Sequence, residues 1–324
     1  MMGSRPLGAR SGVNVSELGL GLWAVAGSEW GPGDDDASLG AIEAALDGGV
    51  TFFDTADVYG DGHSEELLGR AMHGRRDRFQ VATKIGWIGY DHQAGHSRYD
   101  TVEGLVAGVE SSLRRLGTDR IEAIQCHIGH LEPNTPVFIE GFRKLQEQGK
   151  VLAWGVSTSD LGLLQRFNLD GDCDLLQIDY SILNRTAEAE IFPYCEENGI
   201  GVIVRGPLAM GILAGKYNAS ATFPENDFRR SWIQDPVANL QFRDDLTVAE
   251  QLRGVLPEGQ TMVQFALRFV RSHPAVSTVI PGARDRAQSE ANVSAGKLPL
   301  LSAEELEAVN RLVPPGGGRK IWPA

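Results

Sequence analysis

Short, nearly continuous apolar runs alternate with helical stretches along almost the whole chain. The apolar runs cover residues 15–21, 51–54, 79–84, 121–127, 151–157, 175–179, 200–205 and 276–280. They lack the strict apolar–polar alternation of a strand with one wet face, which is typical of parallel strands buried on both sides. The pattern therefore predicts eight buried parallel strands.

Apolar residues at helical spacing follow most of these runs. The predicted helices cover 37–46, 65–72, 101–116, 136–148, 160–167, 188–198, 246–256, 261–272, 286–295 and 303–312. Asp34, Asp35 and Asp36 are candidate N-caps of the first helix. The glycine-punctuated residues before position 15 suit a small hairpin.

Eight strand–helix units predict an α/β fold, a (β/α)8 TIM barrel with its site at the carboxyl ends of the strands. We expect one barrel domain over residues 1–324. A doubly wound open sheet is the alternative, because residues 19–24 (GLGLWA) match the dinucleotide fingerprint with alanine third. That motif needs a helix to open at once, whereas a segment containing Pro32 intervenes. Residues 223–245 are too long for a structureless loop, and we expect either a covering loop or partial disorder.

Composition narrows the class of protein. The 324 residues are 42% hydrophobic and 23% charged, as in a soluble globular protein. The net charge of −13 argues against nucleic acid or an anionic membrane as a partner. Three cysteines without metal-ligand spacing indicate reduced thiols in a cytoplasmic protein. The sequence shows no export signal and no apolar run of membrane-spanning length.

Four polar residues stand at or just after the ends of three neighbouring predicted strands: Asp54, Tyr59, Lys84 and His127. A phenol is a poor acid at neutral pH, and a nearby cation such as Lys84 favours its ionisation. Asp54 could keep that lysine charged, and His127 could hold a carbonyl oxygen beside the phenol. None of these groups transfers electrons, so a hydride must come from a cofactor.

Later strand ends supply candidate cofactor contacts. Ser157, Thr158 and Gln177 offer hydroxyl and amide groups for a carboxamide. The glycine-bearing residues 205–216 could bring backbone N–H groups to a pyrophosphate. After the eighth strand, Gly282 and Arg284 precede a helix whose N-terminus suits a phosphate. Near the first strand, Trp23 and Trp30 could line the pocket, and residues 86–99, with Trp87, Tyr90 and Tyr99, could form a substrate wall.

The motifs resemble the aldo-keto reductase superfamily, in family order along about nine tenths of the chain. The matching segments are VSELGLGLW (15–23), FFDTADVYG (52–60), SEELLGRA (64–71), ATK (82–84), IEAIQCH (121–127), GVSTSD (155–160), QIDYSILNR (177–185), PLAMGILAGKY (207–217) and VIPGARDRAQSEAN (279–292). The resemblance implies a barrel closed at its bottom by an N-terminal β-hairpin plug, with an extra C-terminal helix, that binds NADP(H) without a Rossmann domain.

The resemblance also implies roles for matching positions. Asp54, Tyr59, Lys84 and His127 are similar to the family's catalytic tetrad, with Tyr59 as general acid. The implied cofactor contacts are Gly21, Leu22, Trp23, Ser157, Thr158, Gln177, Arg205, Gly206, Pro207, Leu208, Gly211, Leu213, Gly282, Arg284, Gln288 and Asn292. Among them, Arg284 beside a 2′-phosphate would favour NADPH over NADH.

Three departures from the family pattern concern the site. Thr158 stands where an asparagine is commoner, and Arg205 stands where many members carry an aromatic residue that stacks on the nicotinamide. A guanidinium there could stack by its flat face or contact phosphate. Residues 128–131 (IGHL) replace the usual sequence after the catalytic histidine, at the mouth for the substrate. Family substrate preferences therefore do not carry over.

Together these features predict an NADPH-dependent oxidoreductase that reversibly reduces an aldehyde or ketone, sugar-like compounds included, to an alcohol. One alternative is a cofactor-sensing regulatory subunit that resembles channel-associated β-subunits and turns over little. Another is a barrel enzyme for phosphorylated sugars with no nicotinamide. The expected partners are a small carbonyl or alcohol substrate and neither nucleic acid nor membrane. Self-association stays open.

Overall fold

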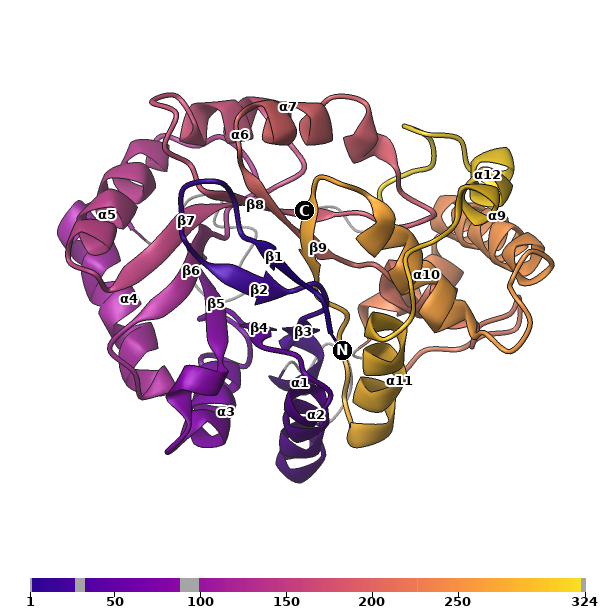
Figure 1. Ribbon diagram of the computed structural model, residues 1–324, viewed down its shortest axis with the longest axis horizontal. Coiled ribbons are helices and arrows are strands. Elements are labelled where there is room, and N and C mark those ends of the chain that lie inside the picture. The colour runs from indigo at the N-terminus through magenta and orange to yellow at the C-terminus, as the bar shows by residue number, and fades with distance from the viewer. Residues whose placement is uncertain (1, 27–32, 88–98, 226, 322–324) are drawn as a thin grey trace.

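The computed structural model describes residues 2–26, 33–87, 99–225 and 227–321. Eight strands form one sheet in the order β10-β9-β8-β7-β6-β5-β4-β3, and all neighbouring pairs are parallel. Parallel bridges join Leu18 to Val279 and Gly21 to Gly282, so the two edge strands meet. The predicted (β/α)8 barrel is confirmed, and the open-sheet alternative is wrong (Figure 1).

The barrel strands are β3 (Leu20–Gly21), β4 (Phe52–Asp54), β5 (Gln80–Ile85), β6 (Ile121–Cys126), β7 (Val151–Ser157), β8 (Leu175–Asp179), β9 (Gly201–Arg205) and β10 (Val276–Val279). The helices are α1 (Trp23–Ala26), α2 (Asp35–Asp47), α3 (His63–Met72), α4 (Val102–Leu116), α5 (Thr135–Glu147), α6 (Leu161–Phe167), α7 (Ile191–Glu197), α8 (Ser231–Gln234), α9 (Pro236–Arg253), α10 (Met262–Ser272), α11 (Arg286–Gly296) and α12 (Ala303–Leu312). Short 3₁₀ turns are η2 (Arg76–Arg78), η3 (Thr186–Glu188), η4 (Ala209–Ala214) and η5 (Phe228–Arg230).

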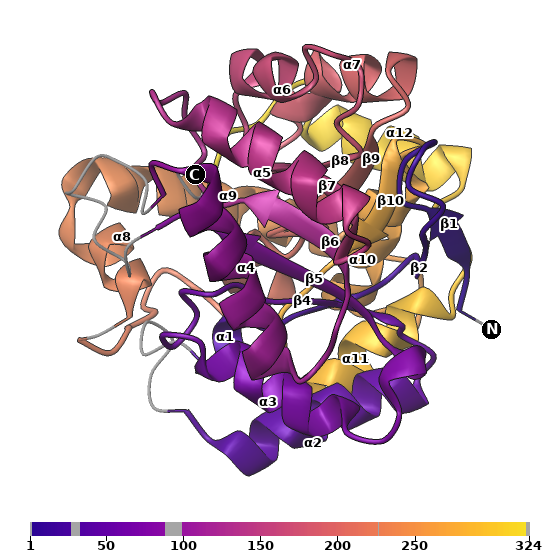
Figure 2. The ribbon, with the colours of Figure 1, turned by 90° about the vertical axis from the view of Figure 1, so that its left-hand side faces the viewer.

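An antiparallel hairpin of β1 (Ser4–Pro6) and β2 (Asn14–Ser16) precedes the barrel. It lies at one end of the barrel, opposite the end that carries α8 (Figure 2). The predicted first strand, residues 15–21, is therefore divided between the hairpin and β3. The apolar run could not show this division, because both pieces are buried.

Inside the barrel the side chains form an apolar cluster. Its members are Phe52, Ala82, Ala123, Ala153, Leu175 and Ile203 from the strands, Ile280 after β10, and Leu7, Val13 and Val15 from the N-terminal segment. The hairpin region thus fills the lower end of the barrel with its own side chains, as a plug. Because alternate residues of a strand share a face, the interior position above each strand member lies two residues further along.

The segment 223–245 is largely helical. It contains η5 and α8, and α9 begins at Pro236, about ten residues before the helix that the sequence predicted. Asp235 caps α9 by accepting from the N–H of Ala238 at 2.8 Å, and proline at the first helical position is compatible with that start. The expectation of a loop or disorder over residues 236–245 was wrong. In the part of the chain that the structure describes, every helix is too short or too polar to cross a membrane.

Candidate active site

Lys84 lies at the centre of the polar residues at the carboxyl ends of the strands. Its Nζ atom is 2.7 Å from Asp54 Oδ2, 2.8 Å from the carbonyl oxygen of Thr55 and 3.2 Å from Tyr59 Oη. Asp54 ends β4, and Lys84 lies in β5, the neighbouring strand. An ammonium group has three N–H donors, and these three oxygens can use all of them.

Burial lowers the pKa of Lys84, which is 1% exposed. The charge and hydrogen bond of Asp54, together with the charge of Asp57, act in the opposite direction, and the charge of Arg205 lowers the pKa further. The second oxygen of Asp54 accepts from the amides of two glutamines, Gln177 at 2.8 Å and Gln125 at 3.4 Å. The carboxylate is therefore surrounded by donors, which compensates its burial.

Aromatic rings surround the phenol of Tyr59. Trp23 stacks on it with a centroid distance of 6.3 Å, and the His127 ring meets it edge-on at 5.8 Å. His127 comes directly after β6, and its backbone N–H donates to the carbonyl oxygen of Ile85 at 3.0 Å. Trp87 donates its indole N–H to the carbonyl oxygen of His127 at 2.7 Å. The structure thus brings together all four residues of the predicted tetrad.

Residues 227–229 lie close to the tetrad, because Phe228 contacts the same Trp23 ring that stacks on Tyr59. Phe228 stacks on Trp23 at 5.8 Å, and Arg229 donates to the carbonyl of Met210 and to Tyr217 Oη. The segment therefore connects the chain that follows β3 with the chain that follows β9. This contact could not be predicted from the sequence, because a single phenylalanine in a polar stretch has many possible contact partners.

The predicted carboxamide contacts lie at the ends of β7 and β8. Ser157 and Gln177 are paired in register and nearly buried. The hydroxyl of Thr158 donates to the carbonyl of Gly129 at 2.7 Å and accepts from the N–H of Asp160, so in this structure it fixes two loops. Gln177 donates its amide nitrogen to Asp54, and among the described residues no side chain or backbone N–H is recorded as donating to its side-chain carbonyl oxygen, which can therefore accept from a ligand.

The glycine-bearing loop after β9 contains η4. Gly206 and Gly211 have φ values of +64° and +97°, which favour glycine. The N–H groups of Ala209, Gly211 and Leu213 already donate within the turn. Leu213 is fully buried in the main core, so its side chain serves packing.

Arg205 ends β9, opposite Asp179 on β8. One terminal nitrogen of its guanidinium is buried, with no hydrogen-bond partner among the described residues. Burial raises the pKa of Asp179, and the charge of Arg205 opposes that shift. A half-buried cation with unused donors suits an oxygen-bearing ligand.

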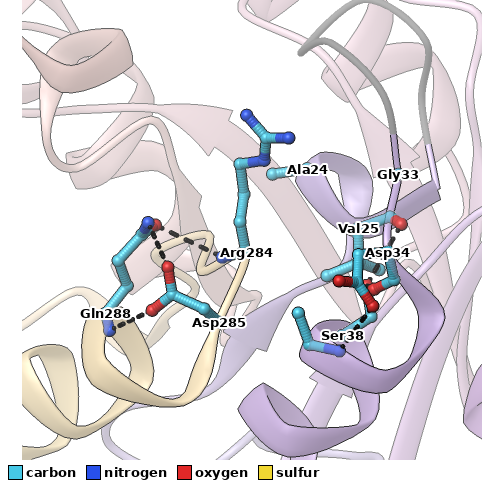
Figure 3. Close-up of a pocket in the computed structure, with 9 residues that line it drawn as sticks. Ala24, Val25, Gly33, Asp34, Ser38, Arg284, Asp285 and Gln288 are labelled. Atoms are coloured by element: carbon cyan, nitrogen blue, oxygen red, sulfur yellow. Dashed lines mark hydrogen bonds between the residues drawn. The ribbon is translucent and has the colours of Figure 1, made fainter.

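A second group of predicted residues lies at the N-terminus of α11. Arg284 and Gln288 line a cavity of about 240 Å³ between α2 and α11, and Asp34 and Ser38 lie on its opposite side (Figure 3). The side-chain carbonyl of Gln288 accepts from the N–H of Arg284 at 3.3 Å. Asn292 donates to the carbonyl of Gly282 at 3.1 Å instead, and it does not line the cavity.

The chain between Gly21 and Trp23 joins the two groups of residues. Gly21 pairs with Gly282, and the N–H of Leu22 donates to the carbonyl of Asp54. Pro207 and Leu208 lie in the turn between β9 and η4. Trp30 and Tyr90 lie outside the residues that the structure describes. Among the described residues, His, Cys, Asp and Glu side chains form no cluster that could hold a metal ion.

Residues 17–314 match the family model described as "Aldo/keto reductase family". The aldo-keto reductase YhdN of Bacillus subtilis is 33% identical over 290 residues, which cover 87% of this chain and 86% of that protein. A probable voltage-gated potassium channel subunit beta of Arabidopsis thaliana is 32% identical over 321 residues, 94% of each chain.

Solved structures of similar fold cover nearly the whole chain. The glycerol dehydrogenase AKR11B4 from Gluconobacter oxydans has a TM-score of 0.80 and 32% identity over 96% of each chain. An aldo/keto reductase from Klebsiella pneumoniae, solved in complex with NADP and acetate, has a TM-score of 0.70 and 26% identity over 94% of each chain.

Proposed function

The chain belongs to the aldo/keto reductase family, and on that premise we propose that it is an NADPH-dependent oxidoreductase that interconverts a carbonyl group and an alcohol. The reaction runs at the carboxyl end of the barrel, with Tyr59 as the proton donor in reduction. Bound NADPH supplies the hydride for the carbonyl carbon. In the reverse reaction the alcohol carbon gives a hydride to NADP⁺, and the phenolate of Tyr59 takes up the proton of the alcohol.

The contact between Lys84 and Tyr59 carries this proposal. Lys84 has only donors, so the phenolic oxygen accepts from it at 3.2 Å. The proton of the phenol must then point away from Lys84, where it can meet a substrate oxygen. A cation fixed beside the phenol also stabilises the phenolate that remains after proton transfer. In this proposal His127 holds the same oxygen, and the contact of its ring with the Tyr59 ring supports that role.

The cofactor is proposed to extend from the tetrad to the cavity beside α11. Gln177 and Ser157 supply polar groups near the tetrad, and Arg284 and Gln288 supply them at the cavity. NADP in the Klebsiella pneumoniae structure supports a dinucleotide of this kind. Arg205 fits a ligand oxygen in the mouth, because part of its guanidinium is buried with unused donors.

Replacing the phenol alone tests the proposal. Tyr59→Phe should lower NADPH oxidation with a panel of aldehydes about a hundred- to ten-thousandfold, as expected for loss of a general acid. NADPH binding, followed by cofactor fluorescence, should stay near wild type. Tyr194→Phe is the matched control, since the Tyr194 hydroxyl lies on α7, outside the barrel, and its one recorded hydrogen bond among the described residues is accepted from Asn168 at 3.1 Å. A near-native rate in the Tyr59→Phe variant would refute the role of Tyr59 as proton donor.

A regulatory role is the second candidate, because the Arabidopsis thaliana channel subunit is similar over 94% of the chain. A cofactor sensor should bind NADPH but oxidise it only very slowly with every aldehyde in the panel. Turnover at ordinary enzymatic rates would exclude it. Failure of NADPH to bind would instead favour the barrel enzyme without nicotinamide.

A further inference from the structure

A polar layer lies directly above the apolar interior of the barrel. Two residues beyond each apolar strand member, on the same inward face, the chain places Asp54, Lys84, Gln125, Gly155, Gln177 and Arg205. Three of these six residues carry charge, and Gly155 has no side chain. Gln125 belongs to this layer, although the motifs do not single it out.

The amide of Gln125 is fully buried and faces Asp54. Its nitrogen is 3.4 Å from Asp54 Oδ1, and its oxygen accepts no hydrogen bond among the described residues. Turning the amide over would place that oxygen against a carboxylate, so the charge of Asp54 fixes the orientation. Gln177 approaches the same oxygen from the far side of the barrel, at 2.8 Å.

An unpaired buried carbonyl costs stability, and an apolar side chain of the same shape avoids that cost. Two residues earlier on the same inward face, β6 places the apolar side chain of Ala123, so on that face the strand carries a polar side chain only where it meets Asp54. The amide at position 125 is therefore best explained by what its N–H group does to Asp54. Two donors on Oδ1 hold the carboxylate plane so that Oδ2 faces Lys84.

We propose that Gln125 is a positioning residue that acts on Tyr59 through Asp54 and Lys84. This inference rests on the proposed function of the same site. By donating to Oδ1, Gln125 fixes the carboxylate that anchors the lysine, and its amide dipole makes the potential at the lysine less negative. Both effects favour release of the phenolic proton to a substrate oxygen.

Gln125→Met removes the donor and keeps the volume of the side chain. It should lower kcat about tenfold, with KM within about twofold, because the interaction acts on proton transfer rather than on binding. The alkaline limb of the kcat profile should move to higher pH, since a more negative site holds the proton longer. Asp54, Asp57 and Arg205 are the charged groups that act on Lys84, and the substitution changes none of them.

Gln125→Glu is the second variant. Its carboxyl group can donate to Asp54 only while it is protonated, and two carboxylates so close cannot both ionise easily. The kcat of this variant should therefore approach wild type at acidic pH and fall as the pH rises, through an ionisation that wild type lacks.

Gln80→Met is the matched control, because Gln80 also has a buried side-chain oxygen without a partner among the described residues, at the opposite end of β5. It should leave kcat and the pH profile unchanged. Lower thermal stability of both Gln125 variants, with wild-type kcat and pH profile, would show that Gln125 only packs and would overturn the inference. Activity in Tyr59→Phe would instead overturn the proposed function, so the two failures are distinguishable.

Discussion

At the scale of single residues, Arg284 in the cavity beside α11 is the proposed contact for the 2′-phosphate of NADPH. Arg284 is exposed, and its backbone N–H donates to Gln288. Asp285 caps α11 by accepting from the N–H of Gln288 at 2.8 Å. An arginine fork at a helix N-terminus suits a phosphate monoester, because charge-assisted hydrogen bonds and the helix dipole act together.

Arg284→Ser should weaken NADPH binding about tenfold and leave NADH binding nearly unchanged, because only NADPH carries a 2′-phosphate. Titration of the two cofactors by fluorescence at fixed salt measures this difference. Arg286→Ser is the control, since that arginine is exposed and pairs loosely with Glu290 at 3.5 Å. An equal loss for NADPH and NADH would refute the phosphate role.

Candidate site residues could be predicted from the sequence where their side chains carry distinctive chemistry. Asp54, Tyr59, Lys84 and His127 carry unusual chemistry at strand ends, and the structure gathers them as the sequence predicted. The contact of Gln125 with Asp54 could not be predicted, because a glutamine in an apolar run has no distinctive chemistry until its neighbour in space is known. The contact of Phe228 with Trp23 could not be predicted either, because it joins segments about two hundred residues apart in the chain.

At the scale of elements, the alternation of strands and helices predicted most boundaries to within a few residues. Buried strands such as β7 and β8 were predicted at their observed bounds, since both faces of a barrel strand are apolar below the site. The start of α9 was missed because its first turns expose Val237 and Leu240 and bury few residues, which leaves no apolar stripe.

The missed half of α9 contains a carboxylate with unusual protonation. Burial raises the pKa of Asp245 to about 6, although it pairs with Arg319 from the C-terminal tail, and the charge of Asp244 adds to the increase. The folded protein therefore holds this proton more tightly than the unfolded chain does. The stabilisation is complete below the ordinary pKa of 3.8 and is lost as the pH rises through about 6.

Asp245→Asn should remove this pH dependence. In wild type the group makes the free energy of unfolding about 1 to 2 kcal/mol higher at pH 5 than at pH 7.5. Urea unfolding of both proteins at the two pH values measures the difference, which should be smaller in the variant by that amount. Asp244→Asn, at an exposed neighbouring carboxylate, should keep most of the wild-type dependence, because burial is the main cause of the raised pKa of Asp245 and the charge of Asp244 contributes least. The same dependence in Asp245→Asn would show that other groups cause it.

At the scale of the whole molecule, the candidate site and the N-terminal plug lie at opposite ends of the barrel. The site occupies the carboxyl ends of the strands, and the β1–β2 hairpin closes the other end (Figure 2). Glu17 connects that plug to the outer helices, because it pairs with Arg5 at 2.9 Å and with Arg271 on α10 at 2.7 Å. Arg271 is only 4% exposed and depends on this counter-ion.

Burial raises the pKa of Glu17, but the hydrogen bonds and charges of Arg271 and Arg5 together bring it below its usual value. The stabilisation is therefore present above about pH 4.5 and is lost as the pH falls. Glu17→Gln leaves the arginine buried without its charge partner, which typically costs about 3 to 5 kcal/mol. Urea unfolding at pH 7 should show a loss of that order, and a smaller one at acidic pH.

The same variant should keep wild-type kcat per folded molecule, because no described contact joins Glu17 to the polar layer around Lys84. Glu290→Gln is the matched control: it breaks an exposed pair with Arg286, and such pairs contribute about 0 to 1 kcal/mol. A fall in kcat that exceeds the loss of folded protein would mean that the plug transmits strain to the mouth. We expect the two ends to be independent, because a packed apolar layer separates them. Such a fall in kcat would contradict that expectation.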